Sequence, residues 1–285
     1  MSKKVYEIIQ ERFVNSIQNV IDGEKELLPW QKPWKGSKPI NYVTRRPYSG
    51  VNLLLLDGGE YLTFNQFKKL QKKNPELEII KGSKKHLVIF WKIVEKENDE
   101  GKIETYPLLR YYYVYHQSSI KNLKSKLPKG NNHQLINEAE KIIENYIERE
   151  KIEIKTIEGG DKASYQPKND IIKIPNKDQF NLVEGYYSTL FHEVGHSTGH
   201  EKRLNRFKEG SFDFGSEVYS KEELIAEISA QMILGTLNIR NMAVEKNSVS
   251  YLYGWMNEIK KDASLIISAS KHAEMAADYV LGKIN

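Results

Sequence analysis

Residues 192–196 read His-Glu-Val-Gly-His, within a stretch whose apolar residues recur with helical spacing. Side chains four positions apart lie on one face of an α-helix, so both imidazoles can reach a single metal ion. Glu193 projects beside them, which gives the HExxH arrangement of two histidine ligands and a carboxylate that takes a proton from water. The alternative is a pair of ordinary helix histidines, but the neighbouring apolar residues favour a helix with one buried face: Leu190, Phe191 and Val194.

The third metal ligand has few candidates. The chain has 285 residues and no cysteine, which excludes disulfides, a thiol nucleophile and any Cys-based metal site. Glu223 and Glu227 lie four apart on a predicted helix, so Glu223 can complete the site and Glu227 can hold the outer N–H of a ligating histidine. Glu222, a quarter-turn away, is expected in solvent. The alternative for this helix is an ordinary exposed acidic face.

His200 is a weaker candidate for the third ligand. It would lie about 12 Å along the helix from His192, and it follows Gly199, a predicted helix end. A further donor should stabilise the oxyanion of a tetrahedral intermediate, and the sequence leaves three residues open for this role: Tyr219, His200 and His272.

This set of side chains predicts hydrolytic chemistry. A zinc ion held by His192, His196 and Glu223 would lower the pKa of its water toward neutrality and polarise a carbonyl group. Glu193 would act as general base and pass the proton to the leaving amine. Histidine and carboxylate ligands suit several divalent ions, so manganese or another divalent cation is the alternative to zinc. The predicted strand at 170–174 could pair with an extended peptide, or form an ordinary hairpin.

Charge divides the chain into two unlike parts. Residues 1–130 carry a net charge of +10, and residues 131–285 carry −5. A basic half attracts polyanions and an acidic half does not, which predicts two domains with different partners. The stretch SKLPKGNN at 125–132 predicts a linker, so we expect domains at residues 1–125 and 126–285. The alternative is an ordinary solvated lysine surface.

Hydrophobic patterning predicts an α+β chain in which a small mixed domain with an antiparallel sheet precedes a mainly helical domain with a short sheet. No apolar run reaches the roughly 20 residues of a membrane span, and the charged start MSKKVYEIIQERF does not suit a signal peptide. We therefore expect a cytoplasmic protein without a membrane partner. The pattern predicts helices at 4–21, 63–71, 137–150, 186–197, 221–237, 250–261 and 263–281, and strands at 86–94, 103–115, 152–157 and 171–174.

Aromatic rings among basic residues are typical of single-stranded nucleic acid binding, because bases stack on rings while Lys and Arg follow the phosphates. Aromatic residues in strands are more often core residues, so we expect Phe90, Trp91 and most strand tyrosines in the core. Loops run over the surface, which favours exposed rings in the loop at 22–50, although such a tryptophan can also anchor its loop. The DNA-binding candidates from these clusters are Trp30, Trp34, Lys35, Arg45, Arg46, Tyr48 and Lys84.

Two family resemblances follow from these segments. An HExxH helix followed by a second helix carrying Glu is similar to gluzincin-type metallopeptidases, which favours Glu223 as a ligand. Nearly the whole chain resembles the antirestriction protein ArdC and its relatives from plasmids and conjugative elements. The segments that carry this second resemblance are LPWQKPW (28–34), NYVTRRPYSGVNLLLL (41–56), YLTFNQ (61–66), KGSKKHLVIFWK (81–92), YYVYHQ (112–117), ASYQPKNDIIKIP (163–175), FNLVEGYYSTLFHEVGHSTGHEKRLNR (180–206), FGSEVYSKEELIAE (214–227), SYLYGWMNEIKKD (250–262) and AEMAADYVLG (273–282).

The ArdC resemblance implies a single-stranded-DNA-binding domain before a zincin-like metallopeptidase domain. It also implies metal binding and protection of incoming DNA from restriction. Arg45, Arg46, Tyr48 and Asn52 fall in the most recognisable N-terminal segment of the family, so Asn52 joins the DNA-binding candidates.

Three hypotheses remain. The first is a single-stranded-DNA-binding protein that also carries a metallopeptidase site, with a restriction enzyme or another protein or peptide as its substrate. The second is a DNA-binding protein whose metal is structural, for which Glu193 would be unnecessary. The third is a peptidase whose basic half recognises proteins, for which salt-dependent DNA binding would be absent.

Overall fold

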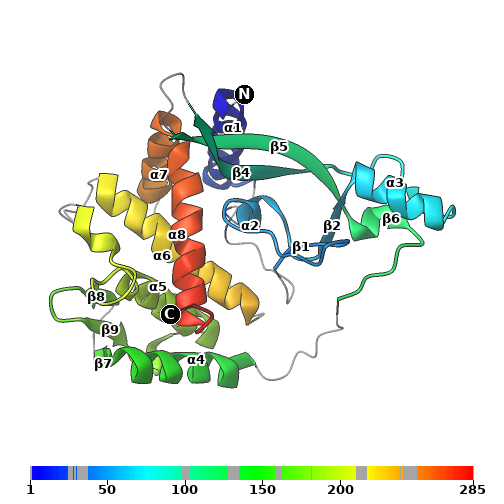
Figure 1. Ribbon diagram of the computed structural model, residues 1–285. Helices are drawn as coiled ribbons and strands as arrows, with labels where there is room; N and C mark the ends of the chain where they lie inside the picture. Colours follow the sequence, from blue (N-terminus) through cyan, green and yellow to red (C-terminus); the bar gives the residue numbers. More distant parts are fainter. Residues whose placement is uncertain are drawn as a thin grey trace.

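A computed structural model describes residues 2–24, 28, 30, 38–97, 103–127, 135–157, 162–180, 182–209, 217–237, 239 and 249–284. It is an α+β structure with a mixed N-terminal half and a mainly helical C-terminal half, which confirms the expected fold class (Figure 1). The proposed boundary between residues 125 and 126 follows the last strand of the first half. Most of the expected linker lies outside the described residues.

The N-terminal half is built around a sheet with strand order β1-β2-β5-β4. Strand β1 pairs in parallel with β2, and the other neighbours are antiparallel. Thr63 caps helix α3 through a capping box with Gln66. The elements of this half are α1 (Ser2–Ile21), β1 (Ile40–Asn41), α2 (Asn52–Leu55), β2 (Glu60–Thr63), α3 (Phe64–Lys73), β3 (Glu78–Ile79), β4 (His86–Glu97), β5 (Ile103–His116), the 3₁₀ turn Gln117–Ser119 and β6 (Ile120–Lys121).

The C-terminal half combines a three-stranded sheet of order β7-β9-β8 with a group of packed helices. Helix α6 packs against both α5 and α8, and these helices are largely buried. Strand β8 is a short strand that the sequence analysis missed. The elements are α4 (Leu135–Glu150), β7 (Glu153–Ile157), β8 (Ser164–Gln166), β9 (Ile171–Pro175), α5 (Val183–Ser197), α6 (Glu217–Thr236), α7 (Val249–Lys261) and α8 (Ser264–Val280), with 3₁₀ turns at Lys177–Gln179 and Arg206–Glu209.

The two halves share one hydrophobic core. Helix α1 places an apolar residue on one face every four positions, and this face packs against α7. Gln10 on α1 donates to the carbonyl of Ile259 on α7 at 3.0 Å. The buried cluster therefore runs from the start of the chain to its last helices, and includes Val5, Ile9, Phe13, Ile17, Leu252, Trp255, Met256 and Ile259.

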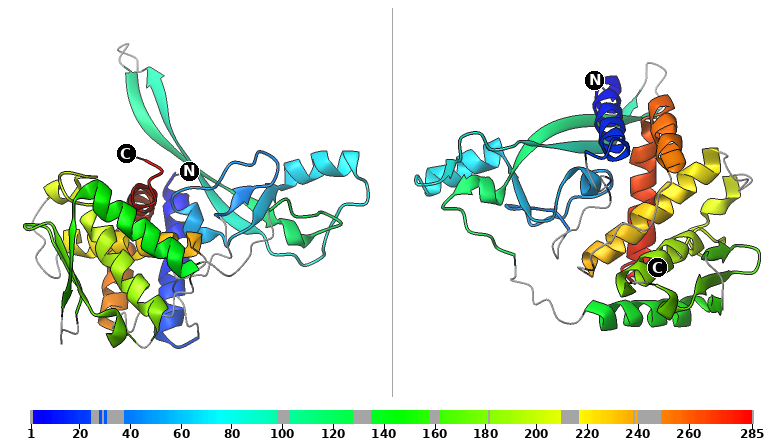
Figure 2. Two further views of the ribbon diagram at one scale, coloured as in Figure 1. Left: turned by 90° about the horizontal axis from the view of Figure 1, so that it is seen from below. Right: turned by 180° about the vertical axis from the view of Figure 1, so that it is seen from behind.

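The β4–β5 hairpin extends well beyond the body of the molecule (Figure 2, left view). Near its base, Leu87, Val88 and Val114 are buried, and so is Leu109, which pairs with Trp91 farther along. Phe90, Trp91 and Glu95 of β4 are exposed. Among the described residues, no helix has the length and apolar character of a membrane span.

Candidate metal centre and DNA-binding surface

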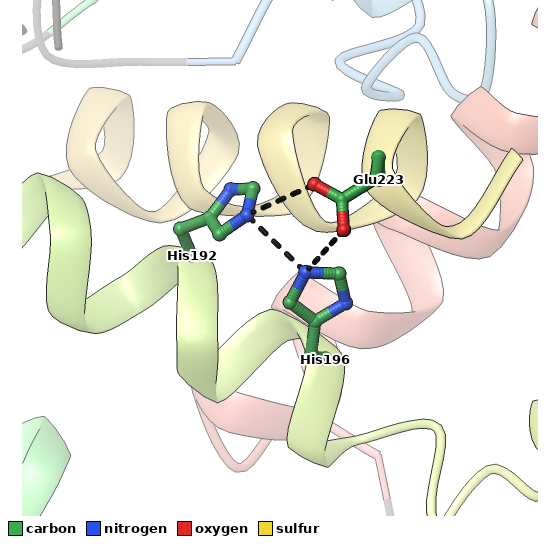
Figure 3. Close-up of side chains that lie close together, drawn as sticks. All are labelled: His192, His196 and Glu223. Atoms are coloured by element: carbon green, nitrogen blue, oxygen red, sulfur yellow. Dashed lines mark hydrogen bonds and ion pairs between the residues drawn. The ribbon is translucent and has the colours of Figure 1, made fainter. Parts of the chain in front are cut away.

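Helices α5 and α6 bring His192, His196 and Glu223 to one point (Figure 3). The two histidine Nε2 atoms lie 3.2 Å apart. Glu223 places Oε2 3.6 Å from Nε2 of His192 and Oε1 3.4 Å from Nε2 of His196. Two ligand atoms bonded to a tetrahedral ion at about 2.0–2.1 Å lie roughly 3.3 Å apart. The spacing and the donor types therefore fit a divalent metal ion.

The outer nitrogen of each histidine faces a second carboxylate. Nδ1 of His192 lies 3.5 Å from Oε2 of Glu227, at the position where the sequence analysis expected Glu227. Nδ1 of His196 lies 3.6 Å from Oε1 of Glu222. Glu222 is only 6% exposed, so the expectation that it lies in solvent is wrong. Because α6 packs across α5, the residue before Glu223 meets the second histidine.

Burial and charge compete at these side chains. Burial disfavours the charged imidazole of His192, but Glu223 and Glu227 outweigh this cost and raise its pKa well above the usual value. For His196 the same competition with Glu222 and Glu223 raises the pKa to about 9. Burial opposes ionisation of Glu223, yet the two histidines lower its pKa far below the usual value. The centre therefore stabilises positive charge placed among its carboxylates.

Glu193 is a buried carboxylate beside this centre, and its charge contributes to the raised pKa of His192. His200 lies beyond the end of α5, where its Nδ1 accepts from the backbone N–H of Lys202 at 3.2 Å. It is outside the three-residue group that could hold a metal ion. On α8, Nδ1 of His272 lies 2.9 Å from the carbonyl oxygen of Ser268. The side chain of Tyr219 lies outside the described residues.

Strand β9 pairs with β7 on one edge and with β8 on the other. The hypothesis that residues 170–174 pair with an extended peptide is therefore wrong, because both edges of this strand are occupied.

The DNA-binding candidates from the loops occupy different environments. Trp30 is 1% exposed and packs against Phe13 and Trp255, with ring centroids 6.5 and 5.6 Å away. Its expected surface position is wrong, since no ring face is left for a base. The amide of Asn52 donates to the carbonyl of Ile89 at 2.8 Å and accepts from its N–H at 2.7 Å, so it is used in the fold. Trp34 and Lys35 lie outside the described residues.

The remaining candidates lie at or near the surface. Arg46 and Lys84 are exposed. Arg45 is partly exposed and forms an ion pair with the buried carboxylate of Glu60. Tyr48 is half-buried, and burial raises its pKa to about 12.

Four aromatic side chains of the β4–β5 hairpin are exposed, against the expectation of core positions. Phe90 is 44% exposed, Trp91 46%, Tyr112 37% and Tyr113 48%. Phe90 pairs with Arg110 in the strand register, and Tyr112 pairs with Val88. Phe90, Arg110 and Tyr112 therefore share one face of the hairpin. This trio joins two rings and one cation, and its two rings were expected in the core because aromatic residues in strands are commonly buried.

The fold and the site define a two-part protein with a zincin-like metallopeptidase domain. The zincin-like metallopeptidase family matches residues 139–272, and the N-terminal domain of anti-restriction factor ArdC matches residues 3–115. The chain therefore combines the ArdC N-terminal domain with a zincin-like metallopeptidase domain, the two parts that the resemblance to ArdC-like antirestriction proteins implies.

Solved structures agree with this assignment. The metal-free crystal structure of antirestriction ArdC protein from the R388 plasmid is 28% identical and superposes with a TM-score of 0.72, covering 97% of this chain and 96% of that one. The Mn(II)-bound structure of the same protein is 28% identical, with a TM-score of 0.73 and 97% coverage of both chains.

Curated relatives include a DNA primase TraC from Escherichia coli, 29% identical over 98% of this chain. A second TraC from this organism is 27% identical over 99% of the chain. The chain spans 20% and 27% of the length of these two primases. Protein y4eC from Sinorhizobium fredii is 27% identical, and the match covers 97% of this chain and 91% of y4eC.

Proposed function

We propose that this protein binds single-stranded DNA through its N-terminal half and carries a metal-dependent peptidase site in its C-terminal half. In this proposal the protein acts in the cytoplasm of the recipient cell, where it protects incoming DNA of a plasmid or conjugative element from restriction. The observation that carries the enzymatic part is the convergence of His192, His196 and Glu223 with Glu193 buried beside them. A restriction enzyme or another protein is the proposed peptide substrate.

The side chains at the metal centre are of two kinds: proposed metal ligands, and carboxylates that hold those ligands in place. His192 and His196 supply Nε2 atoms and Glu223 supplies its carboxylate, while Glu227 and Glu222 hold the outer imidazole nitrogens. A bound divalent cation, zinc or manganese, would supply a Lewis acid that activates water and polarises the peptide carbonyl. We propose zinc from the donor set, and the Mn(II)-bound ArdC structure makes manganese the alternative.

Glu193 is the proposed general base. It accepts a proton from the attacking water as the new C–O bond forms, and returns it to the amine nitrogen as the C–N bond breaks. A purely structural metal would not need this carboxylate. The presence of Glu193 in a buried position therefore supports a catalytic rather than a structural site.

Substitution of Glu193 tests this role. Glu193→Gln should retain zinc or manganese binding in calorimetry, since the three ligands are intact. It should lower the hydrolysis rate of an unstructured protein such as casein by roughly 10²-fold or more. Glu201→Gln, an exposed change just beyond α5, is the matched control and should leave the rate unchanged. Unaltered hydrolysis by Glu193→Gln would exclude it as the base, and a metal-loaded wild type without hydrolysis would favour the structural-metal alternative.

The DNA-binding part of the proposal is supported by Phe90, Arg110 and Tyr112 on one hairpin face. Exposed rings offer stacking surfaces to unpaired bases, and a duplex does not present its bases in this way. The cation among them, together with the net charge of +10 over residues 1–130, suits the phosphate backbone. Arg46 and Lys84 remain proposed phosphate contacts.

Single-stranded DNA binding measured against salt tests this part. Phe90→Ala/Tyr112→Ala should weaken binding by about 1–3 kcal/mol per lost stacking contact without changing the salt slope. Arg46→Ala should reduce the salt slope by about one. Tyr253→Ala on α7, another exposed aromatic residue, is the control and should bind normally. Wild-type protein without salt-dependent binding would overturn the DNA proposal and favour a peptidase with a protein-recognition domain.

A further inference from the structure

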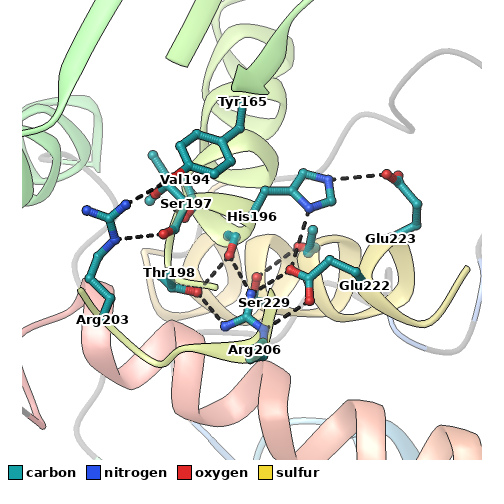
Figure 4. Close-up of polar contacts among 12 residues, drawn as sticks. Tyr165, Val194, His196, Ser197, Thr198, Arg203, Arg206, Glu222, Glu223 and Ser229 are labelled. Atoms are coloured by element: carbon teal, nitrogen blue, oxygen red, sulfur yellow. Dashed lines mark hydrogen bonds and ion pairs between the residues drawn. The ribbon is translucent and has the colours of Figure 1, made fainter. Parts of the chain in front are cut away.

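A buried ion pair lies directly behind the second histidine. Arg206, which follows α5 in the chain, places Nε 3.0 Å from Oε2 of Glu222 and Nη2 2.6 Å from Oε1 (Figure 4). Both side chains are 7% exposed. The same Glu222 oxygen Oε1 lies 3.6 Å from Nδ1 of His196. One guanidinium, one carboxylate and one imidazole therefore form a continuous chain that ends at the metal centre.

The arginine is held in its orientation by other contacts. Nη1 donates to Oγ1 of Thr198 at 2.8 Å, and Nη2 donates to the carbonyl of Gly195 at 3.0 Å. A guanidinium that binds both oxygens of a carboxylate fixes the plane of that carboxylate, which a lysine ammonium cannot do. Arg206 therefore determines where the two oxygens of Glu222 lie, and it does so from the end of the helix that carries His196.

Glu222 needs this partner because of its surroundings. Its carboxylate is 7% exposed, so it is largely removed from water and is held between His196 and Arg206. Glu193, Glu223 and Glu227 also lie close to the two histidines. A further carboxylate in this group, without a cation behind it, would be repelled by the others. An outer partner on Nδ1 fixes the imidazole orientation and leaves Nε2 for the metal.

We propose that Arg206 is a positioning residue for the metal: it holds Glu222, and through Glu222 it holds the imidazole of His196 with Nε2 toward the ion. This inference rests on the proposed metal centre. It adds that metal affinity depends on a residue that touches no metal ligand. In this inference Glu222 has the same role toward His196 that Glu227 has toward His192.

The chain offers a matched control in Arg203. Arg203 lies in the same loop, its side chain is 0% exposed, and it forms an ion pair with Asp170. It donates to the carbonyl of Ser197 at the end of α5, as Arg206 does to that of Gly195. Its guanidinium donates to Tyr165 and Asp170 of the β8–β9 hairpin, on the other side of the loop's contact with α5. A change at Arg203 therefore disturbs the same loop without reaching His196.

The test compares zinc affinities of the full-length protein by competition with a chromophoric chelator. Arg206→Lys should weaken zinc binding 10- to 100-fold, the range found when outer partners of metal-binding histidines are removed. Arg203→Lys should change it less than about threefold, even if both variants lose thermal stability. The absorption spectrum of the cobalt-substituted protein should change in Arg206→Lys and not in Arg203→Lys.

A double-mutant cycle tests whether Arg206 acts through Glu222. In a Glu222→Gln background, Arg206→Lys should have little further effect on zinc affinity, since the carboxylate it positions is gone. Equal zinc affinity in wild type and Arg206→Lys, equal losses in Arg203→Lys and Arg206→Lys, or additive losses in the cycle would each overturn this inference alone. A wild type that binds no zinc or manganese would instead overturn the proposed metal centre. Hydrolysis is not a readout in this test.

Discussion

Gly195, inside the HExxH motif, lies where α5 packs tightly against α6. A Cβ atom at this position would lie 2.5 Å from Oγ of Ser229 and 3.2 Å from Cα and O of Ala226. Only the serine side chain can rotate away, so Gly195→Ala must push the two helices apart. We expect a loss of about 1–3 kcal/mol in the free energy of unfolding, although alanine favours a helix. Zinc affinity should fall as well, because the shift separates Glu223 from the histidines.

Gly254 on α7 is the control for this prediction. Nothing lies within 4 Å of a Cβ atom there, and the residue is exposed. Gly254→Ala should therefore stabilise the protein by about 0.5–1 kcal/mol through helix propensity alone. Urea denaturation and zinc competition measure both variants. A Gly195→Ala protein as stable as wild type, with normal zinc binding, would show that the helix contact tolerates a methyl group.

Among single residues, the sequence predicts those contacts that depend on spacing along one helix. The spacing of His192 and His196 on one helix is sufficient to place two imidazoles together. Glu222 and Arg206 could not be found in this way, because their contact depends on how α6 crosses α5. An arginine ten residues after the motif was the available signal, but nothing in its sequence position distinguishes it from Arg203.

At the scale of elements, the short helix α2 protects the open edge of the main sheet. Strand β4 is an edge strand, and Asn52 satisfies both the N–H and the carbonyl of Ile89. Asn52→Ala should lower the free energy of unfolding by about 1–3 kcal/mol, because it leaves two backbone groups without their partner. The folded variant should still bind single-stranded DNA normally. Thermal denaturation and DNA titration are the measurements.

Asn65, which is exposed on α3, is the control for this prediction. Asn65→Ala should change the free energy of unfolding by less than about 0.5 kcal/mol. If Asn52→Ala were fully stable but bound DNA poorly, the DNA contact suggested by the family resemblance would be correct after all. The structural role would then be secondary.

The periodicity of the sequence predicts where the long helices and strands lie, but it does not predict which of their faces are covered. The predicted helices and strands correspond to α1, α3, α4, α5, α6, α7 and α8 and to β4, β5, β7 and β9, with small differences at their ends. Strand β8 was missed because three residues carry too little pattern. Phe90 and Tyr112 were expected in the core because strands are commonly covered, but at these positions the core packs against the opposite face of the hairpin, with Ile89 and Leu109. Trp30 shows the opposite error, since its ring packs against Trp255 in the core.

At the scale of the whole molecule, the opposite charges of the two halves suggested separate domains, yet the structure joins them closely. Lys38 pairs with Glu274 at 3.4 Å and with Asp278 at 3.1 Å on α8. The backbone N–H of Gly50 donates to Glu274 at 2.7 Å. Helix α8 also packs against α6, which carries Glu223. The loop with the DNA-binding candidates and the metal helix therefore contact the same element.

This arrangement predicts how the chain unfolds. A fragment of residues 1–125 lacks α7, so the apolar face of α1 and the ring of Trp30 would lose their partners. We expect this fragment to show no cooperative urea transition by tryptophan fluorescence, whereas the full chain unfolds in a single one. Addition of the 126–285 fragment should restore the transition, since it supplies α7 and α8. A sharp, reversible transition of the 1–125 fragment alone would contradict the shared core and favour two independent domains.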